Sequence, residues 1–498
     1  MVNNLLRKAK LNALASYVSF IVNSFLTFFV SPFLVKYLGS TSFGIWKAVQ
    51  KVLTFATVAD GRATQALKWV IANKESKDNI LEKQQSVGSA IRIWFYFLPL
   101  VLTIVSVLIW KLPNLINDID AELYPKIQLL GFILGINLLI NPLLGIPDAI
   151  LVGTNNGYKS TIIKTTGIII SNALMILSSY FGYGIIGLGV VVLTVTLLNC
   201  IFIFYITKRS VDWLGVKKPS KEQVKSFFGF SFWVLIWSFV AKLILSTEVL
   251  LISSLINPNE VSNYVFTAYI VQFCVSISLL TGTSITPGLG KLIGAKDEIK
   301  ASMVTKNIRE IILFITAFFG CLILLINKSF VTLWMGDEYF LGSTVNLLIV
   351  LIMIQLVMFR IEGQIQDLSL KIKNKVIVGA ISALLSIFLG VYFYKQMNGR
   401  IEGLFMGVLI GRILLNVMFK TMVNKMMNIK TNFKSFIYLI ILITSCYFLG
   451  EELPVFDSWI LLILFSLVLT FVLMLSCYFL FLSNESKTRI LQVIKSKL

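Results

Sequence analysis

Six basic residues lie inside stretches of the chain that are otherwise apolar enough to cross a membrane. They are Lys47, Lys51, Arg62, Lys242, Arg360 and Arg412. An ionised side chain in hydrocarbon is costly, so each of these groups must face water, a partner or an anion. The acids of the same stretches lie mostly nearer the ends, and cations therefore predominate at mid-depth. This pattern predicts a hydrated cationic cavity that attracts an anionic substrate.

Three of these cations share one predicted helix. Lys47 and Lys51 are one turn apart, and Arg62 follows Lys51 by eleven residues, which at about 100° per residue returns to nearly the same face. A stripe of three cations facing lipid would be very unfavourable. We expect this face to line water, with Lys242 and Arg412 facing the same cavity from the middle of their own stretches.

A structural role is the alternative for these charges. Arg360 has Glu362 and Asp367 nearby in sequence, and pairing between them would only hold helices together. Among the acids, Glu248 is the first candidate for ion coupling and Asp60 the second. Protonation of either carboxylate would change the charge of the cavity and so link a proton to the anionic substrate. A fixed charge partner is the alternative for both.

The amino-acid composition and motifs give little indication of an enzyme. The 498 residues include no histidine, which removes imidazole catalysis and imidazole metal ligands. The segments at 153–160 and 288–292 contain glycine and lysine but lack the spacing of a phosphate-binding loop. We therefore expect no catalytic residue, no metal site and no cofactor.

The elements that must position the charges are transmembrane helices. Hydrophobic residues make up 57% of the chain, enough for many spans of roughly 20 residues. Fourteen stretches are predicted, at about 11–36, 42–71, 88–110, 127–151, 160–181, 185–207, 228–255, 261–287, 307–332, 343–369, 375–395, 401–423, 433–450 and 458–482. Breaks are expected where Pro32, Pro142, Pro147 and Pro287 interrupt them.

The net charge of +20 follows the loops rather than indicating a nucleic-acid partner. Clusters of Lys and Arg fall at the termini and in even-numbered loops, whereas odd-numbered loops carry acids. The positive-inside rule then places both termini in the cytoplasm.

The chain also contains a weak internal repeat. Residues 185–198 resemble residues 401–414, and six predicted spans separate the two copies. An even number of spans gives both copies the same orientation. We therefore predict an all-α integral membrane fold of 14 transmembrane helices, in two six-helix bundles related by a pseudo-twofold along the membrane normal. The predicted parts are an N-lobe at 1–207, a cytoplasmic linker at 208–227, a C-lobe at 228–424, and two accessory helices with a tail at 425–498. Gly403, Gly407 and Gly411 should form a helix-packing face.

Four short motifs resemble one known family. They are Tyr37–Trp46 (YLGSTSFGIW), Asp60-Gly61, Leu333–Tyr339 (LWMGDEY) and Asn398–Leu404 (NGRIEGL). In this order and spacing they resemble the Wzx-type O-antigen and capsule flippases of the multidrug/oligosaccharidyl-lipid/polysaccharide exporter superfamily. The chain departs from the pattern at Glu248, where many relatives have Asp, and in its two extra helices, a feature of lipid II flippases.

The resemblance implies alternating access by two lobes around a central cavity. Its expected cargo is an undecaprenyl-pyrophosphate-linked oligosaccharide repeat unit, moved from the inner to the outer leaflet of the bacterial cytoplasmic (inner) membrane. Membrane lipids, and a polymerase or glycosyltransferases of the same pathway, are the implied partners. Three alternatives stay open: a lipid II flippase, a drug/cation antiporter, and a membrane polymerase or ligase. The antiporter should present acids to its cargo, and such enzymes usually carry a large outer loop.

Overall fold

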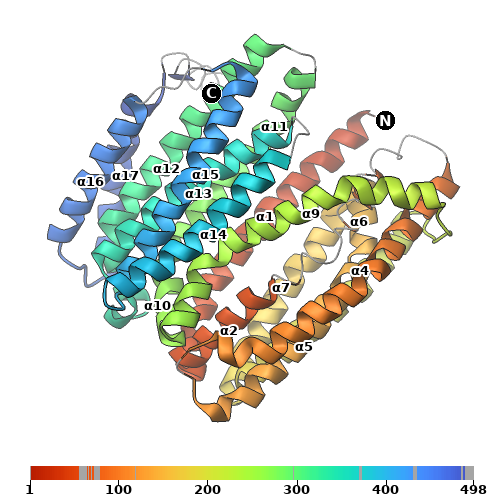
Figure 1. The fold of residues 1–498 in the computed structure, drawn as a ribbon, viewed down its shortest axis with the longest axis horizontal. Coiled ribbons are helices and arrows are strands. Elements are labelled where there is room, and N and C mark those ends of the chain that lie inside the picture. The colour runs from red at the N-terminus through yellow and green to blue at the C-terminus, as the bar shows by residue number, and fades with distance from the viewer. Residues whose placement is uncertain are drawn as a thin grey trace. The chain divides into compact units, whose positions relative to one another are not determined.

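The computed structural model describes the chain as a set of long helices (Figure 1). The described residues are 2–54, 56, 64, 67–68, 70–71, 79–117, 119–294, 297–368, 373–429, 434–483 and 486–487. Over this part of the chain the secondary structure is helical, as predicted, and no strand occurs. The contacts divide the chain into two compact units, Met1–Val261 and Ser262–Leu498.

The described residues of the first unit include eight α-helices. They are α1 (Val2–Leu38), α2 (Ser40–Thr54), α4 (Ile80–Leu115), α5 (Tyr124–Leu144), α6 (Ile146–Gly153), α7 (Gly157–Tyr180), α8 (Gly184–Ser210) and α9 (Lys221–Leu255). Within this unit α1 packs on α7, α5 packs on α4 and α8, and α9 packs on α2 and α4. The break between α5 and α6 falls at Gly145, between Pro142 and Pro147, as predicted. By contrast, α1 runs through Pro32 as one helix.

The second unit begins within α10 (Pro258–Thr267). The helices that follow are α11 (Tyr269–Gly294), α12 (Glu298–Trp334), α13 (Ser343–Asp367), α14 (Lys373–Gln396), α15 (Ile401–Met427), α16 (Lys434–Glu452) and α17 (Trp459–Phe481). Both α16 and α17 pack on α12. Large apolar side chains such as Ile460 and Phe471 remain exposed on α17, as expected for a helix that faces lipid.

A bend of 54° separates α10 from α11. The predicted break of this span at Pro287 is therefore wrong, because α11 continues past that residue. The bend lies next to Thr267, whose carbonyl accepts a hydrogen bond from Asn327 Nδ2 at 2.8 Å. The Thr267 hydroxyl donates to the Tyr339 carbonyl at 3.1 Å. Neighbouring segments thus satisfy polar groups that the interrupted helix leaves exposed.

Twelve described helices are long and apolar enough to span a membrane, and thirteen if α10 and α11 form one bent span. The predicted stretch at 42–71 begins with α2, but most of its second half lies outside the described residues. The count of fourteen and the pseudo-twofold therefore stay predictions. The proposed lobe boundaries are likewise predictions, because contact-based units are a different kind of division.

Two helical hairpins share several features that agree with the proposed repeat. Both α7 and α14 have 24 residues, and both α8 and α15 have 27. Each turn contains residues with positive φ, including Gly182 at 78° and Gly399 at 78°. Near the start of each second helix a glycine lies against the preceding helix: a Cβ on Gly187 would overlap the Ser178 hydroxyl of α7, and one on Gly403 would lie 2.6 Å from the Phe393 carbonyl oxygen of α14.

The glycine face of α15 packs against α14, as predicted. A Cβ on Gly407 would overlap the Leu389 carbonyl group, and a Cβ on Gly411 would lie 2.5 Å from Ser386 Cα. The hydroxyl of Ser382 donates to the Gly411 carbonyl at 2.9 Å. Arg412, the next residue, is 1% exposed.

Candidate functional site

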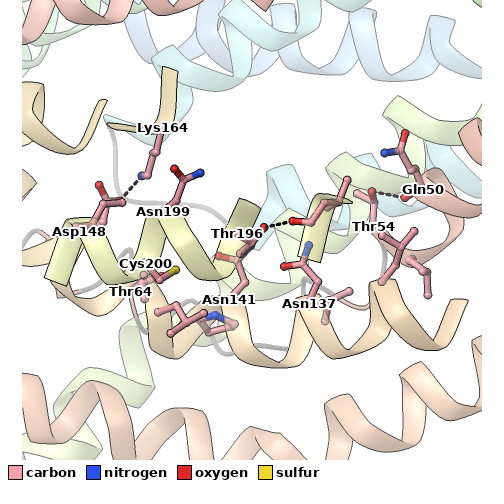
Figure 2. A pocket seen from close by; sticks show the side chains of 18 of the residues that line it. Gln50, Thr54, Thr64, Asn137, Asn141, Asp148, Lys164, Thr196, Asn199 and Cys200 are labelled. Carbon is pink, nitrogen blue, oxygen red and sulfur yellow. Dashed lines mark hydrogen bonds and ion pairs between the residues drawn. The ribbon is translucent and has the colours of Figure 1, made fainter. Parts of the chain in front are cut away.

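A cavity of about 770 Å³ lies within the first unit, between α2, α5, α6, α7 and α8 (Figure 2). Its wall is rich in polar side chains for a membrane helix bundle. Those on the described residues are Gln50, Lys51, Thr54, Thr64, Lys68, Asn137, Asn141, Asp148, Lys164, Thr196 and Asn199. Polar groups at this density would be costly against lipid. The cavity is therefore suited to hold water or a polar ligand.

A charged group centred on Asp148 forms one end of the cavity wall. Oδ2 of Asp148 lies 2.8 Å from Lys164 Nζ and 3.6 Å from Lys68 Nζ. The Asp148 side chain is 9% exposed, while those of Lys68 and Lys164 are 28% and 47% exposed. The hydroxyl of Ser160, on α7, lies near the carboxylate and donates to the Gly157 carbonyl at 2.9 Å. The carboxylate is thus enclosed, and both ammonium groups remain reachable from outside the pair.

The local sequence explains why Asp148 stands there. The helix α5 ends at Leu144, Gly145 joins it to α6, and Pro147 occupies the first turn of α6. Proline fits the first turn because its missing N–H would have no intrahelical partner. Asp148 follows in the same turn, where the positive end of the helix dipole favours a carboxylate.

Apart from Lys51, amides and hydroxyls form the rest of the polar wall (Figure 2). Asn137 and Asn141 lie one turn apart on α5, and Thr196 and Asn199 lie on one face of α8. Within the described part of the chain, Asn137 Oδ1 accepts no hydrogen bond although it is shielded from solvent. Neutral amides and hydroxyls are the groups that pair with sugar hydroxyls.

The predicted site residues of the first unit gather near α2. Lys51 lines the cavity. Lys47 is on the same helix outside the cavity lining, with Nζ 5.1 Å from the centre of the Phe43 ring. Lys242, on α9, donates to the carbonyl of Thr54 at 3.1 Å, and Thr54 itself lines the cavity.

The two predicted coupling acids differ in what the structure describes. Glu248, on α9, is 5% exposed and interacts favourably with the Lys51 ammonium. This places the acid in the same group of charges as the cavity lysine. Asp60 and the predicted cation Arg62 lie outside the described residues.

The remaining predicted cations belong to the second unit. Arg412 is buried on α15, and Arg360, on α13, interacts favourably with Asp367. The alternative pairing of Arg360 with Glu362 is wrong, because the Glu362 carboxylate is bound by Arg309. Nε and Nη2 of Arg309 donate to its two oxygens at 2.7 and 2.8 Å, and Nη1 donates to Asn424 Oδ1 at 2.7 Å.

Sequence reasoning missed the cavity role of Lys68, Lys164 and Asp148. Lys164 had the pattern of a cytoplasmic loop residue, and Asp148 that of an acid near the end of a span. The sequence did indicate that all three residues lie near the same predicted face of the membrane. Which helices are neighbours decides whether such residues meet, and the sequence does not state that.

Comparisons with known proteins identify both a family and a fold. The model of a family described as polysaccharide biosynthesis protein matches residues 70–343, more than half of the chain. The structure of the lipid II flippase MurJ in an inward closed conformation is similar, with 16% identity, a TM-score of 0.67, and coverage of 94% of this chain and 98% of that one.

Two transporters of the MATE family share this fold. An inward-facing multidrug resistance MATE transporter of the MOP superfamily has 14% identity and a TM-score of 0.64, covering 84% of this chain and 95% of its own. The eukaryotic MATE transporter AtDTX14 has 15% identity and a TM-score of 0.59, covering 89% and 99%. Similarity at these identities establishes the fold alone. No curated protein matches the chain.

Proposed function

The chain belongs to the polysaccharide biosynthesis protein family, and from this membership we propose that it is a flippase for lipid-linked oligosaccharides. The cargo is an undecaprenyl-pyrophosphate-linked repeat unit, moved from the inner to the outer leaflet of the bacterial cytoplasmic membrane by alternating access. The proposed lobes are 1–207 and 228–424, with both termini in the cytoplasm. The family match carries this proposal, and the polar cavity supports it.

The charge of the cavity favours an anionic lipid head group. Three lysines, Lys51, Lys68 and Lys164, line it on described residues, against one lining carboxylate, Asp148. A cluster of like charges in a low-dielectric cleft raises the local concentration of opposite charge. A drug/cation antiporter would need the reverse balance, so this cavity argues against that class.

A lipid II flippase is the second candidate. The observation that favours it is the similarity to MurJ over 94% of this chain. At that coverage the similar part includes at least some of the segment that holds α16 and α17. Both candidate cargoes join a saccharide to a prenyl chain through a pyrophosphate. They differ in the saccharide, so direct competition between the two lipids distinguishes them.

The proposed substrate groups are Lys51, Lys242 and Arg412, with Lys47, Arg62 and Arg360 along the path. Glu248, and after it Asp60, is the proposed coupling acid. Protonation of Glu248 would leave Lys51 less compensated and so increase the attraction of the cavity for an anion.

Reconstituted vesicles test the function directly. The purified protein is placed in vesicles that carry a lipid-linked oligosaccharide in one leaflet, and a lectin outside reports the appearance of the glycan. We expect gradient-dependent flipping that Lys51→Gln abolishes and Glu248→Gln uncouples from the proton gradient. Lys159→Gln is the matched control, because Lys159 bonds Ser210 outside the cavity lining. Equal rates in empty and protein-containing vesicles would reject the flippase function.

A further inference from the structure

Two lysines of the cavity converge on one oxygen of one carboxylate. Lys164, on α7, and Lys68 both approach Asp148 Oδ2, at 2.8 and 3.6 Å. A phosphoryl oxygen of a lysine-bound phosphate contacts ammonium groups in the same way as this carboxylate oxygen does. Asp148 therefore occupies a site whose chemistry suits an external oxyanion.

The cavity has more cations than Asp148 can balance. On the described residues, three lining ammonium groups stand against one lining carboxylate, which leaves an excess of two positive charges. Glu248 interacts with Lys51. Among the described groups, the charged neighbours of Asp148 are Lys164 and Lys68. Once Asp148 is displaced, the two ammonium groups of Lys68 and Lys164 match the two negative charges of a pyrophosphate that is esterified at both ends.

We propose that Lys68 and Lys164 form the phosphoryl-binding site of the cavity, and that Asp148 is an internal anion which holds this site until cargo displaces it. This proposal rests on the proposed function. It adds which residues bind the pyrophosphate and why the site is stable when it is empty. Two adjacent ammonium groups repel each other, and Asp148 between them offsets this repulsion in the empty site.

The exposure of the three side chains supports displacement. Asp148 is enclosed at 9%, whereas Lys164 and Lys68 keep 47% and 28% of their side chains exposed. An entering oxyanion can therefore bind the lysines from the open side without first removing Asp148. The carboxylate competes with the ligand throughout, which weakens binding and speeds release, as transport requires.

The amide and hydroxyl wall suits the group attached to the phosphate. Thr196 and Asn199 on α8 and Asn141 on α5 continue the cavity wall from Asp148 (Figure 2). Each can donate to, or accept from, a sugar hydroxyl. A pyrophosphate bound at Lys68 and Lys164 would therefore place an attached saccharide against these neutral polar groups.

Binding of two probes to the purified full chain tests this site. Inorganic pyrophosphate presents the anion alone, and geranyl pyrophosphate presents it on a short prenyl chain. Asp148→Asn removes the competitor with little change of shape, so we expect about tenfold tighter binding, and Lys164→Gln should weaken it about tenfold, roughly 1.4 kcal/mol each way. Lys159→Gln, on the same helix but outside the cavity lining, should bind like the natural chain.

The outcomes separate the possible ligands. Parallel effects on both probes assign the site to the phosphoryl group itself, and effects confined to geranyl pyrophosphate assign it to a lipid head group. Either supports the proposal. Asp148→Asn that binds no tighter, or Lys164→Gln that binds like Lys159→Gln, overturns it. If Asp148→Asn does not fold, Lys68→Gln replaces it, and unchanged affinity in both lysine variants rejects the site.

The vesicle assay distinguishes failure of this site from failure of the function. Normal flipping by Lys164→Gln, together with normal pyrophosphate affinity, removes the site and leaves the flippase function intact. Absence of flipping by the natural chain, with the predicted binding pattern, removes the function and leaves an anion site that serves another transport step.

Discussion

The ion pair between Arg309 and Glu362 should be the strongest single electrostatic contribution to the stability of the second unit. It joins α12 to α13 through two hydrogen bonds of 2.7 and 2.8 Å, and Arg309 also joins α15 through Asn424 at 2.7 Å. The perturbation is Glu362→Gln, which keeps the shape of the side chain and removes its charge.

The expected loss is about 3 kcal/mol. Two unit charges about 4 Å apart attract by about 4 kcal/mol at an effective dielectric constant near 20. Removing one partner of a buried pair typically costs about 3–5 kcal/mol, because the other charge stays buried without compensation. The Arg309 side chain is 17% exposed, so water recovers part of this cost. The lower end of the range is therefore expected.

The assay is unfolding of the detergent-purified protein, followed by tryptophan fluorescence. Glu402→Gln is the matched control. Glu402 pairs with Arg400 at 3.3 Å, and the Arg400 side chain is 67% exposed. Such exposed pairs contribute about 1 kcal/mol or less. In addition, Arg309→Gln combined with Glu362→Gln should be less destabilised than the sum of the two single changes. Equal losses for Glu362→Gln and Glu402→Gln, or strict additivity, would refute the reasoning.

Three further predictions concern packing, water access and topology. Gly407→Ala should destabilise the protein by about 1–3 kcal/mol in the same unfolding assay, since its Cβ would overlap Leu389, while Met406→Ala on the exposed side should have little effect. In single-cysteine variants, a small charged thiol reagent should modify Cys200, which lines the cavity, much faster than the buried Cys274, and equal rates would contradict a hydrated cavity. A green fluorescent protein fused to either terminus should fluoresce and an alkaline phosphatase there should be inactive; an active phosphatase would contradict cytoplasmic termini.

The helices were predictable because hydropathy has a direct physical cause. A membrane span needs a long run of apolar residues, and this requirement is visible in the sequence without knowledge of its neighbours. Helix ends were less predictable where a helix leaves the membrane. The stretch predicted at 307–332 belongs to α12, which starts at Glu298, where the Asp297 side chain accepts a hydrogen bond from the Lys300 backbone N–H at 3.1 Å. Polar helical turns of this kind carry no hydropathy signal.

The site was predictable in kind and less so in its members. Lys51, which residue type and depth had indicated as a site residue, lines the cavity. Residue type and depth could not identify Lys164 as the partner of Asp148, nor Arg309 as the partner of Glu362, because each pair joins different helices. Pairing depends on which helices are adjacent and on how each is rotated. The sequence gives the depth of a residue along its span, but this depth determines neither the adjacency nor the rotation of the helices.

The contrast between the buried charges of the two units is itself an argument for where the anion binds. In the second unit, Arg309 is matched by Glu362 at 2.7 Å and Lys375 by Asp367 at 2.7 Å. Such matched pairs make a buried charge tolerable, and they suffice for packing. The cavity of the first unit is instead lined by three lysines, two of which share the single carboxylate of Asp148. An unmatched excess of charge lowers stability, and features that lower stability persist mainly at functional sites. A negatively charged ligand removes that cost while it is bound, so the imbalance itself favours uptake of an anion by this cavity.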